Sequence, residues 1–278
     1  MAGTSGVTPT AGSAPARIVQ RALRTVRALA PIDARSVARD PLLRWLVAYP
    51  IVLALLLRFG VAALDVPVQA RFGFALSDYG VLIVSFVFEL LPVLCGMVVG
   101  FLLLDARDDG TLAALQVTPL TLGGFLAYRL AAPMALSVAM TLVSVPLVGL
   151  ADVHPVTLVA VALGAAPLAP LFALFLAAFA RNKVEGFALT KAAGILFLPP
   201  VFAYFVHAPW QWAFGVMPTF WPVKALWLRA GVAGASTGVP IGSSSGWAPF
   251  AVVLIVGVAW QALVIAWLLG RFRRAMTS

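Results

Sequence analysis

The feature that most limits the fold of this chain is a series of long apolar runs separated by short polar stretches. A helix of about 20 apolar residues crosses the ~30 Å hydrocarbon layer of a membrane, because within that layer each backbone N–H and C=O group must be paired inside its own segment. Six runs are long enough: 42–64, 79–104, 122–150, 156–180, 186–206 and 247–270. The composition agrees, since 62% of the residues are hydrophobic and only 10% are charged. We expect an all-α polytopic membrane protein with six transmembrane helices.

The chain divides into three expected parts. Residues 1–16 are small and polar and contain no apolar core, so we expect a disordered tail. Residues 17–40 place arginines on one helical face and apolar side chains on the other, which predicts an amphipathic helix on the inner membrane surface. Its anchors to lipid phosphates would be Arg17, Arg21, Arg24 and Arg27. A solvated basic helix and an organellar presequence are the alternatives. Residues 41–278 form the six-span transmembrane domain.

The positive charges indicate how the chain crosses the membrane. The net charge of +9 would suit a nucleic-acid-binding surface, but the apolar runs leave no soluble domain to carry one. Lys and Arg residues instead gather on the cytoplasmic side of membrane proteins. With a cytoplasmic N-terminus, 15 of the 19 Lys and Arg residues lie on that side, and the exceptions are Arg58, Arg71, Lys224 and Arg229. We therefore expect both termini to be cytoplasmic.

Metal-binding and catalytic residue types are scarce. The single cysteine, Cys95, permits neither an intramolecular disulfide nor a thiolate metal site. The two histidines, His154 and His207, both lie near expected outer loops. We expect no metal site and no catalytic residue.

The connection between the fifth and sixth spans is rich in tryptophan. It contains Trp210, Trp212, Trp221, Trp227 and Trp247, five of the eight tryptophans in the chain. Amphipathic rings of this kind gather at the headgroup level of a membrane. We expect short re-entrant helices that dip into the outer leaflet here. In the preceding span, the pair Pro199 and Pro200 is the expected helix break.

A polar stretch between the second and third spans, "DARDDGTLAALQVTPLT" at 105–121, is unusual in so apolar a chain. Gly110 permits a turn, Thr111 suits a helix cap, and Leu112 and Leu115 fall on one face of the helix that follows. The dipeptide at 118–119 starts another helix. A short cytoplasmic helix with a leucine pair is typical of a segment that plugs into a groove on a soluble partner.

This stretch resembles the coupling region of the ABC-2 type transporter permeases. That family has an acidic residue, then Gly-Thr, two leucines and Thr-Pro-Leu-Ser/Thr before the third span. The matching residues here are Asp105, Asp109, Gly110, Thr111, Leu112, Leu115, Thr118, Pro119, Leu120 and Thr121. The amphipathic helix before "RDP", the six spans and "PTFWPVKAL" at 218–226 are also similar, so the resemblance covers nearly the whole chain. Where the family often has a glutamate, this chain has Asp105 or Asp108.

Within that family the chain looks most like small actinobacterial-type permeases that export drugs such as fluoroquinolones. The resemblance implies the transmembrane subunit of an ATP-binding cassette exporter, which moves a drug-like or lipidic amphiphile across the cytoplasmic membrane of a bacterium. It also implies the partners: two ABC ATPase subunits, a second permease that is identical or homologous, and membrane lipid, with no nucleic acid. The expected ATPase-subunit contact comprises Asp105, Asp108, Asp109, Gly110, Thr111, Leu112, Leu115, Thr118, Pro119, Arg181, Lys183 and Glu185.

The chain itself has no nucleotide-binding motif. No G-x-x-x-x-G-K-[ST] loop occurs, and none of the three lysines follows a glycine-rich turn. We therefore expect a permease subunit that is not an enzyme and that binds no cofactor, with ATP and Mg held by the partner ATPase.

Glu89 lies near the middle of the second span, where a charged carboxylate is costly and rarely faces lipid. It would pair with Lys191, Arg58 or Ser85 as a structural contact, or line a substrate path and attract a cationic or zwitterionic drug. A third interpretation is a proton relay, in which case the chain would be a proton-coupled secondary transporter. Such carriers often show an inverted repeat, and we detect none. A membrane subunit without a transport role, such as a resistance sensor, also stays open.

Overall fold

A computed structural model of the chain describes residues 41–108, 122–206, 210–230 and 247–277. Every regular element in these ranges is a helix, and they contain no strand, so the all-α membrane fold is confirmed. The chain divides into two units, Met1–Trp45 and Leu46–Ser278, and the second holds the helix packing that positions the candidate site. The expected tail at 1–16 and interfacial helix at 17–40, with its arginine anchors, lie outside the described residues.

Five helical stretches in the described ranges are long and apolar enough to cross a membrane. All five of the corresponding helices, or helix pairs, start within one residue of the expected limits, whereas the first runs eight residues beyond its expected end at 64 and the last runs seven beyond its expected end at 270. The helices are α2 (Pro41–Phe72), α3 (Gly80–Asp108), α5 (Leu122–Val148), α6 (Pro155–Ala165) with α7 (Leu168–Phe179), and α11 (Trp247–Thr277). A 3₁₀ helix, η1 (Leu76–Tyr79), precedes α3. The chain breaks between α6 and α7 at Ala166 and Pro167.

The fifth expected span is not one continuous helix. Residues 183–205 form three consecutive pieces, α8 (Lys183–Ala193), η2 (Gly194–Phe197) and α9 (Leu198–Phe205). The expected break at Pro199 and Pro200 is therefore found, because both prolines lie in the first turn of α9, where a missing N–H leaves no intrahelical bond unmade. The expected span at 186–206 is therefore helical in consecutive pieces, and a sixth membrane crossing stays a prediction.

The tryptophan-rich connection forms two short helices, η3 (Trp210–Val216) and α10 (Phe220–Ala230), joined by residues 217–219. We call 210–230 the return segment. Helix α10 packs on α6 and α11, and it also contacts α3. Most of α10 is buried, from Phe220 to Leu228 apart from Trp221. Two short helices are thus found where short re-entrant helices were expected, and their position in the outer leaflet stays a prediction.

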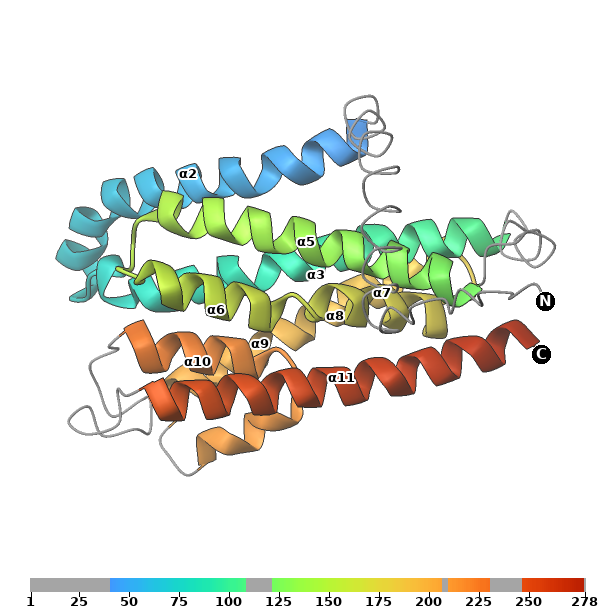
Figure 1. The fold of residues 1–278 in the computed structure, drawn as a ribbon. Coiled ribbons are helices and arrows are strands. Elements are labelled where there is room, and N and C mark those ends of the chain that lie inside the picture. Colours follow the sequence, from blue (N-terminus) through green and yellow to red (C-terminus); the bar gives the residue numbers. More distant parts are fainter. Residues whose placement is uncertain (1–40, 109–121, 207–209, 231–246, 278) are drawn as a thin grey trace, which may run out of the picture. The chain divides into compact units, whose positions relative to one another are not determined.

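Helix α3 occupies the centre of the second unit, packed along α7 and α5 (Figure 1). Two glycines on α3 make the α7 contact possible. A Cβ atom on Gly96 would collide with the carbonyl oxygen of Ala169, and one on Gly100 would lie 2.8 Å from a methyl carbon of Leu176. Glycines four residues apart let two helix backbones approach closely in a membrane, where packing rather than the hydrophobic effect holds helices together.

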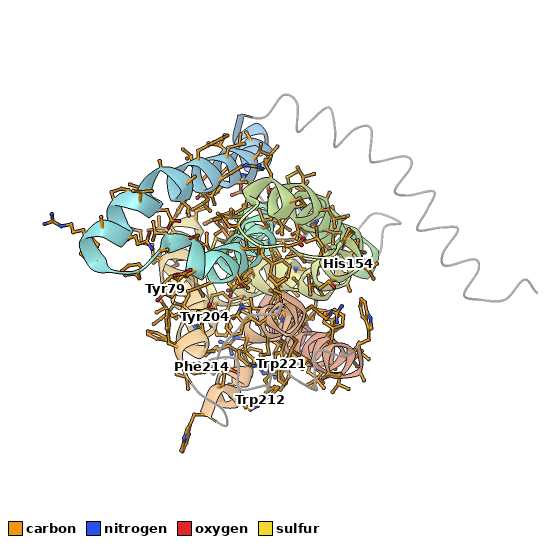
Figure 2. The ribbon with its side chains drawn as sticks, turned by 90° about the vertical axis from the view of Figure 1, so that its left-hand side faces the viewer. Tyr79, His154, Tyr204, Trp212, Phe214 and Trp221 are labelled. Carbon is orange, nitrogen blue, oxygen red and sulfur yellow. The ribbon has the colours of Figure 1, made fainter. Side chains whose placement is uncertain are left out.

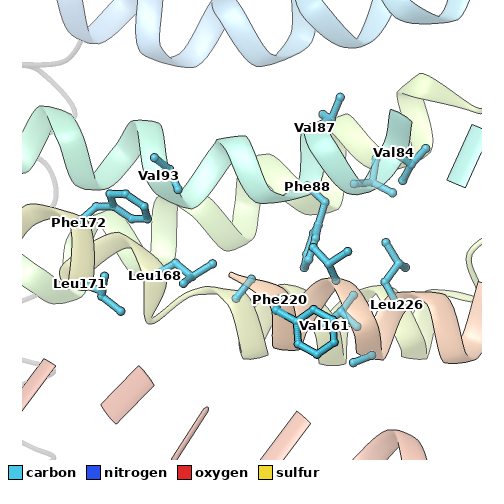
Figure 3. Close-up of a cluster of buried hydrophobic side chains, with 14 of the residues drawn as sticks. Val84, Val87, Phe88, Val93, Val161, Leu168, Leu171, Phe172, Phe220 and Leu226 are labelled. Atoms are coloured by element: carbon cyan, nitrogen blue, oxygen red, sulfur yellow. The ribbon is translucent and has the colours of Figure 1, made fainter. Parts of the chain in front are cut away.

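The core around α3 includes side chains of α3, α6, α7 and α10 (Figure 3). Val84 and Phe88 come from α3, Val161 from α6, Phe172 from α7, and Phe220 from α10, and each is at most 1% exposed. In their most apolar windows, α6–α7 is 72% buried and α3 is 56% buried, against 11% for α2. Helix α2 thus leaves most of the apolar surface of this window uncovered by the described residues.

The bundle has two ends, named here by one aspartate each. The Asp108 end contains the end of α3, the turn between α7 and α8, and the end of α11, where Arg271 stacks on the Phe179 ring at 4.4 Å. The Asp152 end contains the connections at 73–79 and 149–154. There Ser77 donates to the carboxylate of Asp65 from its amide (3.1 Å) and its hydroxyl (2.7 Å), so the turn into α3 is tied back to α2.

Candidate functional site

At the Asp108 end, two segments that are about 75 residues apart in the chain meet. The Lys183 ammonium group lies 2.7 Å from a carboxylate oxygen of Asp105. The pair is partly exposed, with 56% of the Lys183 side chain and 35% of the Asp105 side chain open, so it adds little to stability. The ion pair matters because it shows that the two segments expected to contact an ATPase subunit lie next to each other. We call the group formed by Asp105, Arg107 and residues 181–185 the polar corner.

Arg107 joins the end of α3 to the end of α7. Its guanidinium group donates to the carbonyl oxygens of Ala177 (3.3 Å), Ala180 (2.8 Å) and Arg181 (2.7 Å). The last carbonyls of a helix have no partner within the helix and carry a partial negative charge, so a planar cation with several donors suits this position. A displacement of the end of α3 would consequently be passed to α7.

The turn into α8 is closed by its own side chains. Asn182 is the N-cap and accepts a hydrogen bond from the Glu185 amide at 3.0 Å. The Glu185 carboxylate reaches back and accepts from the Arg181 amide at 2.8 Å. This is a reciprocal arrangement of the capping-box kind, which satisfies two amides at the helix start. Residues 181–185 therefore present a defined, exposed surface.

The expected contact residues fall into two groups. Asp105, Asp108, Arg181, Lys183 and Glu185 all lie at the Asp108 end, and Asp108 is exposed. The remaining contact residues, Asp109, Gly110, Thr111, Leu112, Leu115, Thr118 and Pro119, lie outside the described residues. The short helix itself thus stays a prediction.

Glu89 is buried inside the bundle, 1% exposed. The Thr219 hydroxyl donates a hydrogen bond to its carboxyl group, and its Oε1 atom accepts none from the described residues. Two of the three expected partners are bonded elsewhere. The Ser85 hydroxyl donates to the Val81 carbonyl at 2.6 Å and accepts from Trp227 Nε1 at 2.8 Å. Arg58 donates to the carbonyl of Leu147 at 3.2 Å.

The third expected partner of Glu89, Lys191, is an exposed residue of α8. Glu89 therefore bonds to the return segment and not to any of the residues that the sequence nominated. This contact connects the middle of α3 with Thr219, one residue before α10 begins.

Helix α11 holds the same turn from another side. The Gln261 amide group donates weakly to the Pro218 carbonyl at 3.5 Å, and the Gln261 carbonyl oxygen has no partner in the described part of the chain. One residue earlier, Trp260 Nε1 donates to the Val216 carbonyl at 3.0 Å. The turn at 216–219 is thus contacted by buried polar side chains of α3 and α11. An apolar cavity lies next to it, between α7 and α11.

Aromatic rings from η1, α9 and the return segment gather toward the Asp152 end (Figure 2). Tyr79 and Tyr204 approach with ring centroids 6.5 Å apart, and Trp212 and Trp221 with centroids 6.3 Å apart. Beneath them Lys224 donates to Gln211, whose amide group donates to the Ala203 carbonyl at 2.6 Å. This chain of contacts ties α10, η3 and α9 together, so the expected interfacial tryptophans are also packing residues.

Sequence reasoning missed several of these residues. Arg107 stands inside the motif that drew attention to 105–121, but its carbonyl partners belong to a helix 70 residues away. Thr219 and Gln261 are polar residues in apolar surroundings, which was the available signal. That signal was followed only for Glu89, because a carboxyl group is the costlier group to bury.

Comparison with known proteins gives a consistent family match. The sequence pattern of the family described as fluoroquinolones export permease protein Rv2686c-like matches residues 33–269. The fluoroquinolones export permease protein Rv2686c of Mycobacterium tuberculosis strain H37Rv is 32% identical over 256 residues, which cover 91% of this chain and 95% of the relative. The protein MT2760 of strain CDC 1551, which carries the same description, matches to the same extent. No solved structure matches the chain.

Proposed function

The chain belongs to the Rv2686c-like family of fluoroquinolones export permease proteins, and from that premise we propose that it is the transmembrane subunit of an ATP-driven drug exporter. Its cargo would be a drug-like or lipidic amphiphile, since the spans are nearly uncharged and offer no ring of ion-selective groups. The observation that carries the ATP-driven part is the polar corner, which unites the two segments that resemble ATPase contacts.

In this proposal the Asp108 end faces the cytoplasm of a bacterium and receives two ATPase subunits. The main contact is 105–121, and 181–185 forms the smaller one. The ATP and Mg belong to the ATPase subunits. When those subunits close, they would push on the short helix that follows α3. Because Arg107 bonds to the end of α7 and Asp105 pairs with α8, the push would move the ends of three helices together.

Two permease chains would form the transport path between them, as the family resemblance implies, with α2, α3 and 183–205 as its lining. The open apolar surface of α2 is compatible with a second copy or with lipid. Glu89 would attract a cationic or zwitterionic drug. In the single chain, however, it is buried behind Thr219, so its access to cargo requires the return segment to move.

The experiment for this proposal is purification of the chain with the ATPase that accompanies it, followed by measurement of drug-stimulated ATP hydrolysis. We expect co-purification, and we expect the double substitution Leu112→Asp with Leu115→Asp to abolish the stimulation, because two charges replace the apolar face of the coupling helix. The control is Leu112→Met with Leu115→Met, which keeps both side chains apolar and similar in size and should keep the stimulation. Undiminished stimulation in the variant with two Asp substitutions would reject the docking surface.

The alternative is a proton-coupled secondary transporter that uses Glu89. The buried carboxyl group with one unpartnered oxygen is the observation in its favour. The two mechanisms separate in proteoliposomes that contain this chain alone. A drug gradient built by a pH gradient, without ATP or ATPase, would establish the alternative and overturn the proposal above.

A further inference from the structure

A cavity of about 270 Å³ lies between α7 and α11 at the inner side of the return segment. Four of its nine lining residues are aromatic: Phe172, Phe175, Phe179 and Trp267. The rings are in contact with one another along the wall, with centroids 5.2 Å apart for Phe175 and Phe179 and 6.0 Å apart for Phe179 and Trp267. Small-molecule sites are mostly apolar and occupy roughly 300–1,000 Å³, so this cavity is near the lower limit of that range.

One end of the cavity has a different chemistry. Pro218 and Thr219 line it there, and Thr219 is the one lining residue with a side-chain hydroxyl. That hydroxyl donates to Glu89, so a carboxyl group lies one hydrogen bond beyond the cavity wall. The Gln261 amide group donates to the Pro218 carbonyl. Gln261 lies on α11, one helical turn before Val264, and Val264 lines the cavity. Polar groups from α3 and α11 thus converge on the two residues at this end.

Both polar side chains at this end are incompletely bonded. Glu89 Oε1 and Gln261 Oε1 accept no hydrogen bond from the described residues, although Glu89 is 1% exposed and Gln261 is fully buried. A buried polar atom without a partner is costly, so buried groups of this kind are normally bonded. The two unpartnered atoms are both acceptors. The matching ligand group is therefore one that brings N–H donors.

We propose that this cavity, which lies within one chain and apart from the expected lining of the transport path, is a cargo-binding site, and that it orients an aromatic amine with its rings among the four aromatic side chains and its amine at the Thr219 end. This inference rests on the proposed export function. The aromatic body would stack among the four rings, and the amine would donate to the hydroxyl oxygen of Thr219, whose own proton is donated to Glu89. Binding there would also contact Pro218 and Thr219, so cargo would be sensed by the turn of the return segment.

A lipid acyl chain is the competing occupant, since it too would fill an apolar cavity. It brings no donor for the polar end at Thr219, so that end favours an aromatic amine. The two probes that separate these occupants are norfloxacin, a planar quinolone with a basic amine, and nalidixic acid, a quinolone that lacks this amine.

The test measures binding of both probes to the purified full chain in lipid nanodiscs by equilibrium dialysis, without ATPase or nucleotide. We expect norfloxacin to bind about tenfold more tightly than nalidixic acid, because charge-assisted hydrogen bonds at the polar end contribute roughly 1.5–3 kcal/mol. Val264→Trp fills the cavity and should weaken both probes at least about tenfold. Ile255→Trp adds the same ring to an exposed position of the same helix, and should leave both affinities unchanged.

Thr219→Val removes the hydroxyl but keeps the shape of the side chain. We expect it to lower norfloxacin affinity towards that of nalidixic acid and to leave nalidixic acid unchanged. Thermal unfolding and gel filtration show whether each variant is folded. If Val264→Trp does not fold, Trp267→Ala tests the contact with the aromatic body of the ligand instead. If Thr219→Val does not fold, Thr219→Ser tests the contact with the hydroxyl group. The Trp267→Ala variant should weaken both probes, and Thr219→Ser should bind norfloxacin like the parent chain.

Wild-type affinity for both probes in Val264→Trp would overturn the cavity assignment. Equal weakening of both probes in Thr219→Val would overturn the placement of the amine. A phospholipid that co-purifies with the chain and that norfloxacin does not displace would identify lipid as the occupant. Because none of these measurements involves the ATPase, they can fail while co-purification with an ATPase succeeds, and the reverse also holds.

Discussion

At the residue scale, Glu89 shows how an apolar protein accommodates a carboxyl group. The group is covered by the return segment and bonded to Thr219, and it does not form an ion pair with Arg58, whose guanidinium group bonds to a backbone carbonyl. A neutral hydroxyl partner leaves the carboxyl group with acceptor capacity, as its unpartnered Oε1 shows. A residue held in this way is available to a ligand once the return segment moves.

The substitution Glu89→Gln tests that availability. Glutamine keeps the size of the side chain and an acceptor for Thr219 but removes the carboxyl group. We expect export of norfloxacin to fall by about tenfold, since a hydrogen bond to a charged group contributes roughly 1.5–3 kcal/mol. Drug accumulation in cells is the measurement. Asp152→Asn, the same acid-to-amide change at the exposed connection of the Asp152 end, should export normally. Normal export of every cationic drug by Glu89→Gln would remove Glu89 from the path.

At the element scale, close approach between helices decides the packing. Helices α3 and α7 meet at Gly96 and Gly100, and α11 meets the return segment at Gly257, where a Cβ atom would collide with Trp221. Each glycine removes the side chain that would hold two backbones apart. Helix α2 lacks such a contact at its glycine, since a Cβ atom built on Gly60 has no atom within 4 Å.

Two alanine substitutions separate these situations. Gly96→Ala should destabilise the protein by about 1–3 kcal/mol, because the backbone of α7 must shift to relieve the overlap. Gly60→Ala changes the same residue type in an open position and should be neutral or slightly stabilising, since alanine favours a helix. Thermal unfolding in one detergent, followed by tryptophan fluorescence, measures both. Equal midpoints for the two variants would show that α3 and α7 do not pack through Gly96.

At the scale of the whole molecule, the two ends have different chemistry. The Asp108 end carries the polar corner. At the Asp152 end, the connection before α3 is hydrogen-bonded to Asp65 of α2, and aromatic side chains such as Tyr79 and Tyr204 gather near the return segment. The family and its relatives cover this whole arrangement, since the match extends over residues 33–269. In the proposed exporter, energy would enter at the Asp108 end and cargo would leave at the Asp152 end.

The orientation of the two ends is tested by cysteine labelling. Cys95 is the only cysteine and is buried, so Cys95→Ala provides a background without thiols. Asp152→Cys and Asp108→Cys then place one thiol at an exposed position of each end. In cells that express the chain without an ATPase, we expect a membrane-impermeant maleimide to label Asp152→Cys directly and Asp108→Cys only after permeabilisation. The opposite pattern would place the polar corner outside and end the docking proposal.

The sequence by itself determined the features that depend on neighbours along the chain. Apolar runs of sufficient length must be helical in a membrane, and local signals at Pro199 and Pro200 located a break before any packing was known. The family was also readable, because its motif lies within one short stretch. The tertiary structure alone decided which distant groups meet: Arg107 with the end of α7, Glu89 with Thr219, and the rings of α7 with Trp267. Hydropathy reports how much of a helix is apolar but not how the helix is rotated, and that rotation, set by glycine contacts and buried polar bonds, chooses the partners.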